Sequence, residues 1–171
     1  MNFLQTKLNE MKKRKEAGNK GFSLVELIIV IAIMAILVGI VGTQVIPYIN
    51  KSKESKDLQI INSFSTAAVS SYSEKADELK STTGEIIINV YAASQTEGAD
   101  DNAKADAATL ATEIKKKTYT DKAKVLGNEG KMKSSEGKKI TDIRITINLT
   151  DRTVKTEAVG SNAFKAVEAD L

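Results

Sequence analysis

The chain has 171 residues, of which 42% are hydrophobic and 27% charged, and its formal net charge at pH 7 is +3. It contains no Cys and no His, which excludes Cys and His nucleophiles, His general bases and zinc sites built from these residues. No Ser, Lys or carboxylate cluster stands in a recognisable catalytic motif. We therefore expect that the chain is not an enzyme and binds no metal and no cofactor. The absence of Cys fits either a reducing compartment or export from an organism that seldom uses disulfides.

The positive charge is concentrated in residues 1–21. This segment holds six Lys or Arg residues and two Glu residues, a net charge of +4, so residues 22–171 carry −1. If the segment is removed, the remaining chain is nearly neutral, and the overall charge says nothing about its partner.

Residues 22–46 form a continuous apolar segment whose one ionisable residue is Glu26. As a helix it would be roughly 37 Å long, enough to cross a bilayer core of about 30 Å. The apolar core of a secretory signal is shorter, about 7 to 15 residues, and a small-residue cleavage site follows it. Because the basic residues precede the span, we expect a cytoplasmic N-terminus and an external location for the residues after Pro47.

The carboxylate of Glu26 needs a partner or a route to water. At the middle of a membrane it would cost about 2.5 to 3.5 kcal/mol, and less near the interface. It either meets a cation from another chain or reaches the nearby headgroups. Its position alone does not decide between these interpretations.

Small residues recur three or four positions apart within the span, so they share one helical face. Such a face favours close packing against other helices, although Gly and Ala are also common in membrane spans generally. The residues are Ala32, Ala35, Gly39 and Gly42.

The sequence KGFSLVELIIVIAIMAIL, residues 20–37, resembles the N-terminal motif of type IV prepilins and pseudopilins. In that family a basic leader ends in Gly, Phe usually follows, and Glu stands at the fifth mature position before a long apolar run. Gly21, Phe22 and Glu26 occupy these three positions. The specific resemblance ends near residue 50.

The resemblance implies that a prepilin peptidase cuts between Gly21 and Phe22 on the cytoplasmic side and methylates the new Phe22 amine. It also implies that Glu26 neutralises the Phe22 amine of a neighbouring subunit. An assembly ATPase and an inner-membrane platform protein would then build a helical homo-oligomeric filament. The chain would be a membrane protein before processing and afterwards part of an extracellular pilus for adhesion, twitching motility or biofilm formation.

Two features depart from the commonest pattern of the family. The leader of 21 residues is long for the short-leader subclass, and Met11 is an alternative start to Met1. The Cys pair that closes the C-terminal loop of many Gram-negative pilins is missing, which favours a Gram-positive source.

Two alternatives remain open at this point. A minor pilin, or a pseudopilin of a type II secretion or competence DNA-uptake system, would share every N-terminal feature. An uncleaved single-span membrane protein with an external ligand-binding domain would retain its leader and form no fibre.

Residues 47–171 are predicted to form an exported α+β head. Pro47 has no N–H and its ring crowds the Thr43 carbonyl, so we expect a helix kink there. Apolar residues at helical spacing then continue an amphipathic helix to about residue 80, which completes a long helical spine. They are Leu58, Ile61, Phe64, Ala68, Tyr72, Ala76 and Leu79.

Strands are predicted over 85–92, 140–150 and 153–159, where β-branched residues or alternation indicate a small antiparallel sheet packed on the spine. Residues 93–139 are interpreted as a loop region with a short helix over 103–117. The tail, residues 161–171, fits either a last short helix or a strand.

Two charged stretches of the loop region are interpreted as charged surface and not as binding sites. Asp100, Asp101, Asn102 and Asp106 lack the Gly and distal Glu of an EF-hand, so a solvated loop is favoured over a calcium site. Residues 115–117 and 131–139 are rich in Lys but have no interleaved aromatic residue, so a charged surface is favoured over DNA as a partner.

Overall fold

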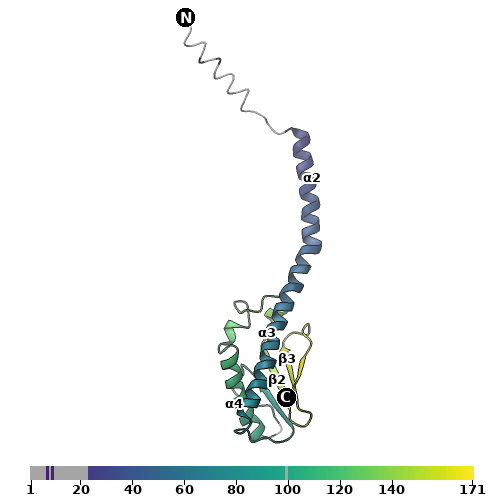
Figure 1. The fold of residues 1–171 in the computed structure, drawn as a ribbon. Helices are drawn as coiled ribbons and strands as arrows, with labels where there is room; N and C mark the ends of the chain where they lie inside the picture. Colours follow the sequence, from purple (N-terminus) through teal and green to yellow (C-terminus); the bar gives the residue numbers. More distant parts are fainter. Residues whose placement is uncertain (1–6, 8, 10–22, 99) are drawn as a thin grey trace. The chain divides into compact units, whose positions relative to one another are not determined.

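The computed structural model describes residues 7, 9, 23–98 and 100–171. The predictions for the leader, including the two alternative starts and the Gly21–Phe22 cleavage site, lie outside the described residues. The chain divides into two compact units, Met1–Ile46 and Pro47–Leu171, which are drawn in Figure 1.

The described part of the first unit is helical. An α-helix, α2, spans Leu24–Ile40, and a π-helical turn, η1, follows at Val41–Val45. All residues of both elements are exposed to solvent. Among the described residues one helix, Leu24–Lys75, is long and apolar enough to cross a membrane, as judged by its length and composition.

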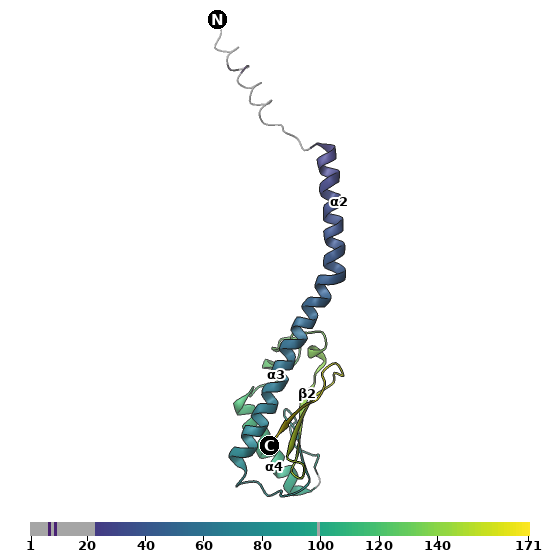
Figure 2. The same ribbon diagram turned by 45° about the vertical axis from the view of Figure 1, so that its right-hand side comes forward.

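The second unit is an α+β head whose four strands form one antiparallel sheet in the order β1-β2-β3-β4. Figures 1 and 2 show this sheet alongside α3. The elements are α3 (Ile46–Lys75), β1 (Glu85–Asn89), α4 (Asp101–Lys117), the short 3-10 helices η2 (Lys122–Lys124) and η3 (Gly137–Lys139), β2 (Asp142–Asn148), β3 (Thr153–Val159) and β4 (Val167–Asp170).

The core of the head lies between one face of the sheet and the two helices α3 and α4. Alternate residues of β2, Ile143, Ile145 and Ile147, are fully buried, because successive side chains of a strand point to opposite faces. Phe64 of α3 and Leu110 of α4 belong to the same buried cluster. The predicted α+β class is therefore confirmed.

The helix α3 ends at Lys75, five residues before the predicted end. The Lys75 carbonyl closes a final turn by accepting hydrogen bonds from the N–H groups of Glu78 and Leu79, at 2.8 and 3.2 Å. The next N–H groups, of Lys80 and Ser81, donate to the Asp106 carboxylate on α4. The Asp106 carboxylate, which is distant in sequence, thus accepts the N–H groups that would bond to main-chain carbonyls if the helix were longer.

The strand β1 also stops early, at Asn89 rather than residue 92. The side-chain amide of Gln95 bonds the Asn89 N–H and carbonyl, both at 2.9 Å, and thereby occupies the edge of the sheet. Tyr91 donates its N–H to Asp142 Oδ1 at 2.9 Å instead of continuing the ladder. Similarly, β2 is shorter at both ends than residues 140–150, whereas β3 has the predicted bounds.

The region interpreted as a loop contains the 17-residue helix α4, which begins two residues before the predicted helix. Asp100 is its N-cap, and its side chain accepts the Ala103 N–H at 2.8 Å. Asp101 and Asn102 form the first turn, and Asp106 is buried. The solvated-loop interpretation of these four residues is therefore wrong, because they cap and anchor a helix. The tail forms the strand β4.

Candidate functional site

The start of α2 is stabilised by a capping box made by Ser23 and Glu26. Ser23 Oγ accepts the Val25 N–H at 3.4 Å, and Glu26 Oε2 accepts the Ser23 N–H at 2.9 Å. Reciprocal bonds of this kind satisfy N–H groups that have no partner within a helix. Glu26 therefore has a role within its own chain that the sequence interpretation missed, although the Ser-x-x-Glu spacing signals it.

The surface of α2 is apolar on all sides. None of its 17 residues is buried, and Glu26 is its one ionisable residue. Leu24, Ile36 and Val38, for example, are 73%, 64% and 68% exposed. A soluble protein seldom leaves so large an apolar surface in water, so this helix requires lipid or other protein chains around it.

The predicted packing stripe lies on this surface. Ala32, Ala35 and Gly39 belong to α2, whereas Gly42 falls in the π-helical turn. A Cβ atom added at Gly39 or Gly42 would meet no atom within 4 Å. Nothing in the described chain fills the space beside these glycines, and the packing role of the stripe stays a prediction.

The hydrogen bonding of the helix changes immediately before Pro47. The Ile46 N–H bonds the Val41 carbonyl, five residues earlier, and the Thr43 hydroxyl bonds the Gly39 carbonyl at 2.9 Å. A π-helical turn is one way in which a helix accommodates a proline ring. The local geometry is consistent with the expected kink, and the bend itself stays a prediction.

A family model described as the prokaryotic N-terminal methylation motif matches residues 17–42. The match is confined to the N-terminal segment and supports the predicted resemblance of that segment to type IV pilins and pseudopilins. This motif supports a pilin-like prepilin substrate, and together with the apolar helix it supports membrane anchoring before processing. Neither the curated proteins nor the solved structures gave a significant match. The predicted Gram-positive source has no support in these findings.

In the head, a buried carboxylate on α3 connects the helix to the loop before η3. Asp57 is 1% exposed, and it accepts the N–H groups of Lys133 and Ser134 at 3.0 and 2.9 Å and the Ser134 hydroxyl at 2.5 Å. A Cβ atom at position 137 would collide with Asp57 Oδ2, so Gly137 permits the close approach. Sequence patterns did not indicate this contact, because its partners lie 76 and 77 residues away.

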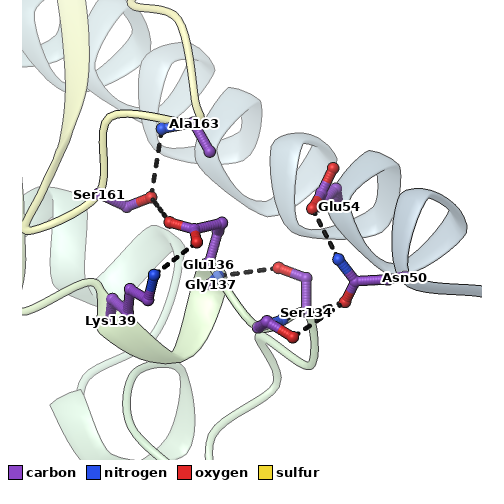
Figure 3. Close-up of polar contacts among 9 residues, drawn as sticks. Asn50, Glu54, Ser134, Glu136, Gly137, Lys139, Ser161 and Ala163 are labelled. Carbon is purple, nitrogen blue, oxygen red and sulfur yellow. Dashed lines mark hydrogen bonds and ion pairs between the residues drawn. The ribbon is translucent and has the colours of Figure 1, made fainter. Parts of the chain in front are cut away.

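Further polar contacts hold the same loop, as Figure 3 shows. Asn50 of α3 accepts the Ser135 N–H at 3.2 Å. Glu136 bonds Lys139 at 2.6 Å and the Ser161 hydroxyl at 2.9 Å. The Lys139 ammonium, and then the Ser161 hydroxyl, lower the pKa of the Glu136 carboxyl. The loop is therefore held both by α3 and by the turn before β4.

A second buried carboxylate, Asp106, anchors the segment after α3. Burial alone would raise its pKa, but interactions with Ser81 and with the Lys80 N–H outweigh this effect and lower the pKa. The Ser81 N–H lies 2.7 Å from Oδ2. No group of three or more potential ligands for a metal occurs among the described residues.

The Asp106 carboxylate should make the stability of the head depend on pH. Its pKa in the folded state lies below the unfolded value of about 3.9, so it contributes stability above that value, which is lost as pH falls through the folded pKa. We expect Asp106→Asn to reduce the difference in unfolding free energy between pH 6 and pH 3, measured by urea denaturation of the detergent-solubilised chain. Asp101→Asn, which alters an exposed carboxylate, is the control and should leave that difference unchanged.

Proposed function

We propose that the chain is the structural subunit of a type IV pilus, cleaved between Gly21 and Phe22, methylated on Phe22 and assembled into a surface filament. One observation carries this proposal: the matched motif opens a helix that is exposed and apolar on every side apart from Glu26. The bilayer covers this helix before processing, and the helices of other subunits cover it in the filament. An assembly ATPase and an inner-membrane platform protein move the subunit between these environments.

Glu26 acts during assembly by binding the Phe22 amine of a neighbouring subunit. Within the described residues its carboxylate accepts one hydrogen bond, through Oε2 from the Ser23 N–H. A carboxylate offers about four acceptor sites, so Oε1 is available to a cation. In an apolar environment, pairing of the two charges removes the cost of burying each one alone.

Close packing of the spans uses the face that carries Ala32, Ala35, Gly39 and Gly42. Small residues let helix backbones approach where no hydrophobic force distinguishes a helix from lipid. This face of one subunit meets a different face of the next. Such heterologous contacts generate an open helical fibre instead of a closed ring.

Gly21→Ala is expected to block processing and to abolish filaments. The mass of the purified protein should then include the leader of 21 residues, whereas the parent chain should start at methylated Phe22. Gly18→Ala, the same substitution inside the leader, should leave cleavage intact. Normal filaments from Gly21→Ala would contradict the proposal.

In sheared surface fibres the parent chain should be abundant, as expected of a major pilin and not of a pseudopilin.

A further inference from the structure

The head has separate basic and acidic surfaces, although residues 22–171 carry a net charge of only −1. A groove beside α3, here called the lysine groove, is lined by Lys56 and Ile60 of α3, by Tyr119, and by Lys131 and Lys133 of the loop after α4. Lys131 Nζ lies 5.2 Å from the centre of the Tyr119 ring. No carboxylate lines the groove. In the described part of the chain, none of its three lysines forms an ion pair.

The lysine groove has a defined position because the buried Asp57 carboxylate holds its wall. The Asp57 side chain accepts the Lys133 N–H at 3.0 Å. Met132 is fully buried between the exposed residues Lys131 and Lys133. Both lysines therefore extend outward from the same side of a fixed segment, as alternate residues of an extended chain do.

The opposite charge gathers on the outer face of the sheet, here called the acidic sheet face, which comprises Glu85, Glu168 and Asp170. These residues are exposed. Glu168 and Asp170 of β4 pair in register with Lys155 and Thr153 of β3. The neighbouring strand positions Val154 and Thr156 are fully buried, so Glu168 and Asp170 point away from the helices.

Three carboxylates of the acidic sheet face have no ion-pair partner in the described chain. Lys155, which pairs in register with Glu168, bonds Glu157 at 2.8 Å. Glu157 raises the pKa of Lys155 most strongly, and Glu168 and Glu85 add smaller contributions. One lysine is thus shared among several carboxylates, and Glu85, Glu168 and Asp170 remain available to cations from outside the subunit.

We propose that the lysine groove of one subunit binds the acidic sheet face of a second copy, so that the heads make an electrostatic contact in the filament; this inference rests on the proposed function. The two surfaces have complementary charge: within the described residues, the groove has three lysines without an ion-pair partner, and the sheet face has three carboxylates without one. Each also has an apolar part, Ile60 in the groove and the half-buried Ile87 on the sheet, as interfaces usually do. They lie on different layers of one head, so the contact is heterologous and propagates.

Charge reversal tests this contact in cells that make filaments from the full chain. We expect Lys131→Glu/Lys133→Glu to lower the yield of sheared filaments by about tenfold or more, because like charges then face each other. Glu168→Lys/Asp170→Lys should have the same effect. The variant with all four substitutions restores opposite charges and should recover most of the yield. Lys138→Glu/Lys165→Glu, two exposed lysines outside the groove, is the control and should assemble normally.

Two readouts separate a failure of this contact from a failure of the proposed function. Each variant should be cleaved, with a mass that starts at methylated Phe22, and should accumulate to the parent level in the membrane. Normal filaments from either charge-reversed pair, or no recovery in the combined variant, would overturn the contact and leave the pilus assignment intact. Normal filaments from Lys131→Glu/Lys133→Glu, combined with lost binding to an oligonucleotide probe, would instead assign the groove to a polyanion. A retained leader in the parent chain would overturn both inferences.

Discussion

Glu26→Gln is expected to abolish surface filaments while the leader is still removed at Gly21–Phe22. Glutamine is nearly the same size and still presents a carbonyl oxygen to the Ser23 N–H, which Glu26 accepts at 2.9 Å. The variant therefore keeps the capping box but loses the negative charge. If neutralisation of a neighbouring Phe22 amine drives assembly, loss of the charge alone is sufficient to stop it. Filaments counted by electron microscopy, together with the mass of the membrane-bound subunit, measure the two effects.

Ser23→Ala is the matched control, because it removes the other half of the capping box and retains the Glu26 charge. The loss of an N-cap side chain costs about 1 kcal/mol of helix stability, which a long span in a membrane tolerates. We expect nearly normal filaments from this variant. The opposite pattern, with filaments from Glu26→Gln and none from Ser23→Ala, would show that Glu26 serves as a helix cap and not as an assembly charge.

The N-terminal segment was predictable from sequence because its properties are local. Charge before the span, uninterrupted apolar residues and the order Gly21, Phe22, Glu26 can all be seen without knowing the fold. The capping box is equally local, because the Ser-x-x-Glu spacing of Ser23 and Glu26 signals it, but the sequence interpretation considered only the charge of Glu26. Alternation along β2 also indicated its buried face directly, because the period of a strand does not depend on its partner.

The features that sequence reasoning did not predict depend on contacts distant in the chain. Asp57 and Asp106 look like ordinary polar residues of amphipathic helices, yet both are buried. Their backbone partners lie 76 and 77, or 26 and 25, residues away. Likewise, Tyr119 and Lys131 are separated in sequence and meet only in the fold. No aromatic residue interleaves with these lysines in the sequence, whereas in the fold the Tyr119 ring lies beside Lys131.

The second large effect is expected from Asp57→Ala, which should strongly destabilise the head. The substitution leaves three donors without their partner, namely the N–H groups of Lys133 and Ser134 and the Ser134 hydroxyl. Buried donors that lose a charged acceptor cost about 3 to 5 kcal/mol in unfolding free energy. Urea denaturation of the detergent-solubilised full chain measures this loss. Asp77→Ala, at an exposed position just beyond α3, should change the value by about 0.5 kcal/mol or less.

If the lysine groove binds a second copy as proposed, the Asp57 contact also links the stability of the head to its assembly. Because Asp57 holds the segment that carries Lys131 and Lys133, its loss should release the wall of the lysine groove before the whole head unfolds. Amide hydrogen exchange in residues 131–137 should therefore accelerate in Asp57→Ala under native conditions, while β2 and β3 remain protected. Uniform acceleration across the head would instead mean that Asp57 supports the entire fold. Unchanged exchange and unchanged stability would show that neither role depends on this carboxylate.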